Sequence, residues 1–412
     1  MGGLATNQDL LNIQKNLSNM IINMNDNLFS KIDTIDNCVS NQTCLELVNY
    51  IDHVKGQKDA GLEVFNGVQG LDFSEDGKTA YLTCVLHSSI MEVDLETGKT
   101  IPHILTDPDN SALLLNPDDI VRVGNKLYFE ALVILDTETG GYLNYSAVYS
   151  LEIDNNNPWK SVRLWQSKPG EVFVNPIAHA DGFLYTATAL GIKVNQFGIA
   201  TGPPDADGNL TLLDETTTPH YPRKIWKLTM TGEVVWEKEY DLYVNAFDIR
   251  DGFIYAPAQD LGGHRDAAWA FQSTEFHIVR VNIENGEMEK LVSFPKLPQN
   301  AYPVACKFMG NKLFCHTDRI WVFDYDTTLK NINKESMRLA YDFDIHRPQI
   351  QMTTFYAYVN GQYVEADHQQ KYTLADNGKA HPDGVHYYIS GQNKLFKMKL
   401  RDENRKPIPV LN

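Results

Sequence analysis

Short segments typical of β-hairpins recur throughout the chain after Gly61, and they are of two alternating kinds. The first kind has two short apolar runs around a tight turn such as Asp-Gly or Gly-Asn, a pattern that favours a hairpin. Its six copies are GLDFSEDGKTAYLT, DDIVRVGNKLYFE, AHADGFLYTA, FDIRDGFIYAP, VACKFMGNKLFCH and HPDGVHYYIS. The second kind is an apolar strand that continues through a turn into another strand. Its six copies begin at Ile90, Val148, Ile225, Ile278, Ile320 and Leu395.

Two successive hairpins make one four-stranded sheet, and six such sheets in series are the pattern of a six-bladed β-propeller. A pair of β-sandwiches would also contain many short strands. The paired six-fold repeat favours the propeller. We therefore predict an all-β fold, a six-bladed β-propeller over residues 61–412.

The first sixty residues have a different pattern, and for residues 1–60 we predict a helical leader. Between Gln8 and Ile35 the apolar side chains recur at spacings of three and four, which places them on one side of an amphipathic α-helix. They are Leu10, Ile13, Leu17, Met20, Met24, Leu28, Ile32 and Ile35. Such a helix either packs on the propeller or pairs with a second copy of the chain as a coiled coil, which would give a homodimer.

Charge and hydropathy restrict the partners and the location. The formal net charge is −17, which argues against nucleic acid or an anionic membrane as a partner, because both bind positive protein surfaces. No apolar run approaches the roughly 20 residues of a transmembrane segment, and no signal peptide is evident. We expect a cytoplasmic protein, with secretion as the open alternative. Of the five cysteines, Cys306 and Cys315 would face each other across a hairpin.

An asparagine precedes five of the six hairpins of the first kind. These residues are Asn66, Asn116, Asn175, Asn245 and Asn300. The first strand of each propeller blade runs beside the central axis, so these side chains would converge there. A ring of amide oxygens with one or two carboxylates suits calcium, which takes 6–8 oxygen ligands. The alternative is that each asparagine bonds to its own backbone at a strand start.

Carboxylates and histidines accompany these asparagines. Asp119 follows Asn116, and Asp248 follows Asn245, at the same offset of three residues. The sixth blade offers His381 and Asp383 in the sequence HPDG. His179 lies four residues after Asn175. A histidine near a bound cation can act as a general base, although most histidines of this kind have a structural role.

In this combination of architecture and asparagine-bearing inner strands, the chain from about Gly61 onward resembles the calcium-dependent six-bladed propellers. That group includes gluconolactonases, paraoxonases and squid-type diisopropylfluorophosphatase, with strictosidine synthase as a non-hydrolytic relative. Its members typically bind calcium through a Glu of the first blade, Asn residues of middle blades and an Asp. The resemblance implies as ligands Glu63, Asn116, Asn175, Asn245, Asp383 and Asn300, with Asp72 as the alternative to Glu63 and with Asn66 as a further candidate. The segment LEVFNGVQGLDF matches the Glu-Gly-Pro start of that group only loosely.

The resemblance implies a Ca²⁺-dependent hydrolase that acts on a small-molecule lactone or ester at the central channel. Calcium would polarise the substrate carbonyl, and His179, His381 or Asp383 would activate water. Two alternatives remain open. The first is a non-hydrolytic cyclase or synthase that uses the same channel mouth, and the second is a propeller without catalytic activity that binds a peptide or small molecule. The sequence contains no Gly-x-Ser-x-Gly, His-Glu-x-x-His or phosphate-binding glycine motif.

Overall fold

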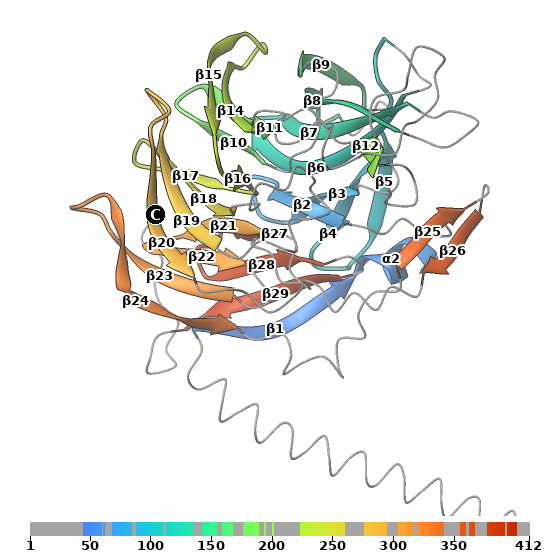
Figure 1. Ribbon diagram of the computed structural model, residues 1–412. Helices are drawn as coiled ribbons and strands as arrows, with labels where there is room; N and C mark the ends of the chain where they lie inside the picture. The colour runs from blue at the N-terminus through green and yellow to red at the C-terminus, as the bar shows by residue number, and fades with distance from the viewer. Residues whose placement is uncertain are drawn as a thin grey trace, which may run out of the picture.

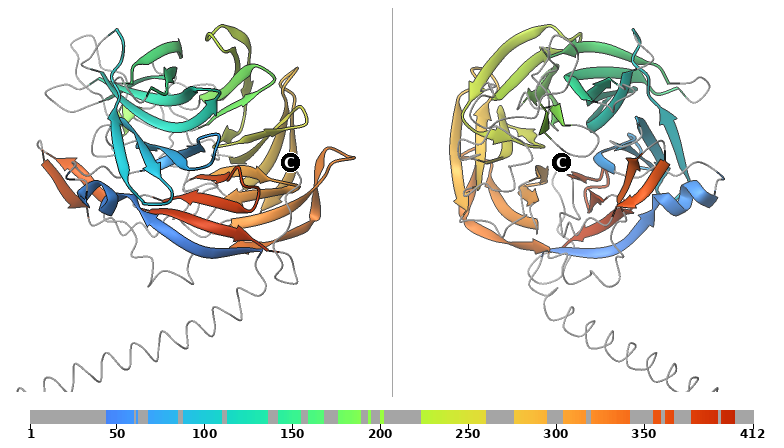
Figure 2. Two further views of the ribbon diagram at one scale, coloured as in Figure 1. Left: turned by 180° about the vertical axis from the view of Figure 1, so that it is seen from behind. Right: turned by 45° about the vertical axis from the view of Figure 1, so that its right-hand side comes forward.

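The computed structural model shows a six-bladed β-propeller, as predicted, with sheets arranged around one axis (Figures 1 and 2). It describes residues 44–59, 61, 68–84, 88–109, 113–135, 142–154, 159–167, 176–188, 193–194, 200–201, 223–259, 276–294, 304–316, 320–341, 355–359, 362–366, 377–391 and 394–401. The inner strands β2, β6, β10, β17, β21 and β27 contact one another in this order, and β27 contacts β2, which closes the ring.

The first three blades each contain four antiparallel strands in chain order. Blade 1 comprises β2 (Val68–Phe73), β3 (Thr79–Cys84), β4 (Ser89–Asp94) and β5 (Thr100–Ile104). Blade 2 comprises β6 (Leu113–Val123), β7 (Lys126–Leu135), β8 (Tyr142–Glu152) and β9 (Ser161–Gln166). Blade 3 comprises β10 (Ile177–Ala180), β11 (Phe183–Thr188), β14 (Arg223–Thr229) and β15 (Val234–Tyr240).

The remaining blades complete the ring. Blade 4 comprises β16 (Tyr243–Val244), β17 (Asp248–Arg250), β18 (Phe253–Gln259), β19 (Phe276–Asn282) and β20 (Met288–Phe294). Blade 5 comprises β21 (Ala305–Met309), β22 (Lys312–His316), β23 (Ile320–Asp326) and β24 (Asn331–Tyr341). Blade 6 comprises β27 (Asn377–Ala380), β28 (His386–Ser390), β29 (Lys394–Leu400) and β1 (Leu45–Asp52). Two small hairpins are β12 (Lys193–Val194) with β13 (Ala200–Thr201), and β25 (Phe355–Val359) with β26 (Gln362–Ala366).

Buried apolar clusters between neighbouring sheets form the core. Between blades 2 and 3, for example, Val121 and Val148 pack with Leu184 and Trp226. Runs of consecutive buried residues, such as residues 80–84 of β3, give a sheet two covered faces, because successive side chains point to opposite faces. Both faces of an inner strand are therefore covered, and polar side chains on them must find partners at the axis.

The N-terminal strand β1 closes the ring, which corrects two predictions. Residues 45–52 fall in the predicted helical leader, but they form the outermost strand of blade 6 and pair with β29, with Leu45 opposite Leu400. The hairpin predicted from Leu395 onward therefore supplies only β29 to this sheet, because β1 occupies its outer edge. Helix α2 (His53–Asp59) follows β1. The amphipathic helix predicted over residues 8–35 lies outside the described residues.

Two further sequence-based expectations can be compared with the structure. Cys306 and Cys315 are cross-strand partners in β21 and β22, as predicted, and their buried Sγ atoms lie 2.8 Å apart. Both are free thiols. Among the described residues, no helix has the length and apolar character needed to cross a membrane.

The first prediction concerns ring closure by β1. Leu45 is 1% exposed and packs in the cluster between blades 5 and 6, whereas Val48 on the same strand is 47% exposed. Leu45→Ala should lower the free energy of unfolding by about 2–5 kcal/mol, because it leaves a cavity in the core. Val48→Ala, the matched control, should change it by less than about 0.5 kcal/mol. Denaturant titration followed by circular dichroism measures both, and equal effects would contradict the role assigned to β1.

Candidate functional site

Aspartates on the inner strands link neighbouring blades. Asp72, Asp119 and Asp248 each accept one hydrogen bond from the N–H of the following residue. The second carboxylate oxygen accepts from the inner strand of the next blade. These second bonds are Arg122 N to Asp72 Oδ2 at 2.8 Å, Ile177 N to Asp119 Oδ2 at 3.3 Å, and Phe308 N to Asp248 Oδ2 at 2.9 Å. The repeated aspartates therefore satisfy backbone donors between blades.

Side chains from opposite blades meet at Asp119. Asn377 Nδ2 donates to Asp119 Oδ1 at 2.9 Å, and Lys307 Nζ lies 3.4 Å from Asp119 Oδ2. Lys307 Nζ also donates to the Phe247 carbonyl at 2.9 Å. Burial raises the pKa of Asp119, and the Lys307 ammonium opposes that shift. A protein ammonium group thus supplies the positive charge beside Asp119.

The predicted amide ligands have different environments. Asn245 is fully buried, and its Oδ1 accepts a hydrogen bond from the Ala246 N–H at 2.9 Å, which fits the backbone-bonding alternative. Asn116 is partly exposed on β6, before the bulge that contains Asp119. Glu63, Asn66, Asn175 and Asn300 lie outside the described residues.

A buried carboxyl group with little hydrogen bonding lies in blade 2. Glu130 on β7 is 0% exposed, and among the described residues the Ser146 hydroxyl is close enough to act on its carboxyl group, but no well-formed hydrogen bond reaches either carboxyl oxygen. Burial raises the pKa of Glu130 well above its ordinary value, and the negative charge of Asp118 raises it further. The nearby Ser146 hydroxyl offsets this shift only in part. Burial therefore favours the protonated form of Glu130, and a bound cation would favour the carboxylate.

Glu130 faces blade 3 together with two other polar groups. Its cross-strand partner Val148 packs against Trp226 of blade 3, and Trp226 is the cross-strand partner of Thr186. The hydroxyl of Thr186 is also buried, and no described residue bonds to it. Asn116 lies opposite Leu132, two residues from Glu130 on the same face of the sheet. Long side chains at such diagonal positions can reach each other.

The predicted catalytic residues do not lie with Asn116 and Glu130. His179 comes two residues after Ile177, which bonds to Asp119, whereas Asn116 comes three residues before Asp119. At about 3.3 Å per residue, His179 and Asn116 are roughly 15 Å apart along the axis. Burial lowers the pKa of His179. Asn377 contacts Asp119, and His381 follows Asn377 by four residues. His381 therefore lies roughly 13 Å further along the axis than Asp119, in the same direction as His179.

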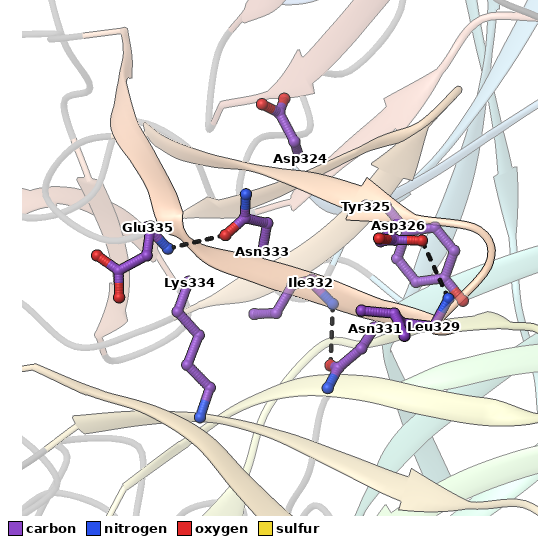
Figure 3. A pocket seen from close by; sticks show the side chains of 9 residues that line it. All are labelled: Asp324, Tyr325, Asp326, Leu329, Asn331, Ile332, Asn333, Lys334 and Glu335. Carbon is purple, nitrogen blue, oxygen red and sulfur yellow. Dashed lines mark hydrogen bonds between the residues drawn. The ribbon is translucent and has the colours of Figure 1, made fainter.

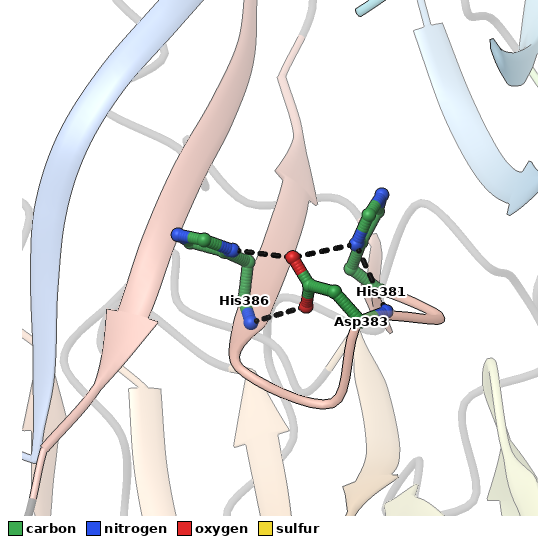
Figure 4. Close-up of side chains that lie close together, drawn as sticks. All are labelled: His381, Asp383 and His386. Atoms are coloured by element: carbon green, nitrogen blue, oxygen red, sulfur yellow. Dashed lines mark hydrogen bonds and ion pairs between the residues drawn. The ribbon is translucent and has the colours of Figure 1, made fainter. Parts of the chain in front are cut away.

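His381 and Asp383 form a compact cluster with His386 in the β27–β28 turn (Figure 4). Asp383 Oδ2 lies 2.9 Å from His381 Nδ1 and 2.6 Å from His386 Nδ1. Asp383 Oδ1 accepts from the backbone N–H groups of Val385 and His386. Partial burial alone would raise the pKa of Asp383, but these hydrogen bonds hold it well below its ordinary value. The structure thus joins His381 to Asp383 and separates both from Asn116.

The surface hollow shown in Figure 3 lies away from both clusters. It is formed by the β23–β24 hairpin of blade 5, and its lining includes Asp324, Tyr325 and Leu329. β24 is the outermost strand of its sheet, so this hollow is on the periphery of the ring. Its place does not match the predicted site at the axis.

Comparisons with known proteins support the fold. No protein-family model and no curated protein sequence matches the chain. One similar solved structure is the PQQ-bound form of aldose sugar dehydrogenase from Streptomyces coelicolor. It is 11% identical with a TM-score of 0.50, and the match covers 87% of this chain and 98% of that chain. A glucose dehydrogenase has the same identity and TM-score, with coverage of 87% and 99%. Likeness at this identity shows the propeller fold alone.

The second prediction concerns the buried ion pair at the centre. Lys307→Met should lower the free energy of unfolding by about 3–5 kcal/mol, because it leaves Asp119 buried without its countercharge. The double variant Asp119→Asn/Lys307→Met should lose less than the sum of the single variants. Lys126→Met removes an exposed pair with Glu152 and serves as the control, with a loss below about 1 kcal/mol. Additive losses in denaturant titrations would show that Asp119 and Lys307 do not interact.

The third prediction concerns the pH dependence of stability from Glu130. Because its pKa is raised in the folded state, Glu130 contributes stability that is fully present below about pH 4.3 and is lost as the pH rises through the folded-state pKa. Glu130→Gln cannot ionise. Its stability relative to the wild type should therefore increase by up to about 1.4 kcal/mol per pH unit within that range. Parallel profiles for wild type and variant, measured without divalent cations, would contradict this assignment.

Proposed function

We propose that this protein is a hydrolase that acts on a lactone or an ester with a calcium ion bound between blades 2 and 3. The observation that carries the proposal is the fully buried carboxyl group of Glu130, whose oxygens form no well-formed hydrogen bond with a described residue. Burying a polar group without a hydrogen bond costs free energy, and a bound cation would remove that cost. Asn116, which the sequence predicted as a ligand, is on the same face of the sheet.

The side chains around Glu130 fit calcium. Glu130, Asn116 and Thr186 would offer oxygen ligands, and calcium accepts carboxylate, amide and hydroxyl oxygens together. The group of polar contacts at Asp119 does not fit a calcium ion. Both oxygens of Asp119 already accept hydrogen bonds, and Lys307 supplies the positive charge there. The proposal therefore keeps Asn116 from the predicted ligand set and adds Glu130.

Calcium at this place would polarise the carbonyl group of the substrate and stabilise the oxyanion that develops on it. The chain itself would supply three things. Glu130 would exchange its proton for the cation. Asp118, whose charge raises the pKa of Glu130 and whose carboxylate lies beside the Gln69 amide of blade 1, would accept a proton from water. The Asp119–Lys307–Asn377 contacts would limit how far a substrate enters along the axis.

The solved neighbours also support a catalytic role. Aldose sugar dehydrogenase and glucose dehydrogenase are enzymes, so propellers of this shape can hold an active site. Their chemistry is not carried over, since fold alone does not specify a reaction. Hydrolysis is preferred here because oxygen ligands for a hard cation are present beside Asn116.

The fourth prediction tests the calcium site. Calcium should bind to the wild type and release a proton from Glu130, because metal binding requires the deprotonated carboxylate. At a free concentration 100 times Kd, it should stabilise the fold by about 2.7 kcal/mol. Glu130→Gln should keep its fold and lose both effects, whereas Glu152→Gln, at an exposed position, should keep both. Calorimetric titration in buffers of different ionisation enthalpy measures binding and proton release together.

Activity is tested with a panel of simple lactones and aryl esters. Turnover that needs calcium and disappears in Glu130→Gln would support the hydrolase. Calcium binding without turnover would point instead to a non-hydrolytic cyclase or synthase, or to a propeller that only binds a ligand. Absence of calcium binding in the wild type would overturn the proposed site.

A further inference from the structure

We propose that His381, Asp383 and His386 form a second metal site, one for a divalent transition-metal ion and in the first place Zn²⁺, at the seam between blades 6 and 1. This site is independent of the calcium site proposed beside Glu130. It lies in and beside the β27–β28 turn of blade 6, whereas Glu130 lies on β7 of blade 2. The sequence HPDGVH provides all three ligands.

The three ligand atoms already have nearly the spacing of a coordination sphere. His381 Nδ1, Asp383 Oδ2 and His386 Nδ1 lie within 4.8 Å of one another, and the two contacts with Oδ2 measure 2.9 and 2.6 Å. Zinc binds imidazole nitrogen and carboxylate oxygen at about 2.0–2.2 Å, which places neighbouring ligand atoms about 3–3.5 Å apart. Metal entry thus needs only a small outward movement of side chains in a turn.

The hydrogen bonds of His381 favour a cation at this point. Its Nε2 lies 2.8 Å from the carbonyl oxygen of Gly77, which can only accept, so Nε2 carries a proton. Its Nδ1 lies 3.2 Å from the Asp383 N–H and 2.9 Å from Asp383 Oδ2. A cation between Nδ1 and Oδ2, which can be a proton or a metal ion, makes this contact attractive.

The groups around the cluster hold the ligands as in established metal sites. A metal-bound histidine usually donates its other ring N–H to a carbonyl or carboxylate, as His381 does to Gly77. The His381 ring also packs edge-on against Phe73, with 5.0 Å between the ring centroids. Gly77 has φ +69°, and a Cβ there would lie 2.8 Å from Cε1 and Nε2 of His381. Gly77 thus leaves the space that the imidazole occupies.

The ligand set selects the kind of metal. Two imidazoles and one carboxylate suit zinc and other late divalent transition metals, whereas calcium and magnesium prefer oxygen alone. Three protein ligands leave at least one coordination position for water, as in zinc sites that bind an exchangeable ligand. The side chains of His381, Asp383 and His386 are 12%, 36% and 20% exposed, so water can reach that position.

The fifth prediction is that the full chain, stripped by a chelator, binds one Zn²⁺ at this cluster. His386→Gln should weaken zinc binding about 100-fold or more, because it removes one of three ligands. His103→Gln is the matched control. His103 also contacts a carboxylate, Glu92 Oε2 at 3.0 Å, but the described residues around it provide no third ligand. Calorimetric titration with zinc alone should give the wild-type affinity for His103→Gln.

X-ray absorption of the zinc-loaded wild type keeps the test independent of how the variants fold. Two imidazole nitrogens and one carboxylate oxygen near 2.0–2.2 Å from zinc would support the site. Zinc binding that is unchanged in His386→Gln, or a coordination shell without two imidazoles, would overturn it. Glu130→Gln should bind zinc normally, and His386→Gln should bind calcium normally. The absence of metal binding at one of the two sites would therefore not contradict the proposal for the other site.

Discussion

The ring depends on backbone donors that the inner strands carry to the middle of the molecule, where water cannot satisfy all of them. Asp72, Asp119 and Asp248 solve this problem by accepting two N–H groups each, one of them from the next blade. Each aspartate therefore fixes the height of one inner strand relative to the next. Placing three carboxylates, two of them buried, so close to one axis has an electrostatic cost, and Lys307 and Lys379 offset it with ion pairs to Asp119 and Asp72.

The polar residues near the axis are of two kinds, those that stabilise the ring and those that are candidates for ligand binding or catalysis. Asp119, Lys307 and Asn377 have partners and hold the ring together. Glu130 has only the nearby Ser146 hydroxyl among the described residues, and His381 Nδ1 lies 2.9 Å from a carboxylate oxygen of Asp383. Buried or closely spaced ionisable groups of this kind are candidates for function. On this criterion, the molecule has one oxygen-rich candidate site in blade 2 and one histidine-rich candidate site in blade 6.

The repeat of hairpins sufficed to predict the six blades, because strand alternation and turn residues are local properties. It could not predict that β1 completes blade 6, since that pairing joins distant parts of the chain. The sequence indicated Asn245 and Asp383 but could not distinguish a ligand from a backbone hydrogen bond, because both need the same oxygen. Two features of the sequence do point to these two sites. Glu130 is a lone acid in the apolar run KLYFEALVIL, and His386 completes a His-x-Asp-x-x-His spacing.

The pairing of β1 with β29 also has a consequence for biosynthesis. Strand β1 is synthesised before the other propeller strands, whereas its partner β29 is synthesised after them. Until then the apolar face of β1, including Leu45, has no permanent neighbour, and blade 6 lacks its outer strand. Contacts between such distant segments slow folding and lengthen the time during which strand edges are exposed to aggregation. On the ribosome, the ring can therefore close only after the last blade has been synthesised.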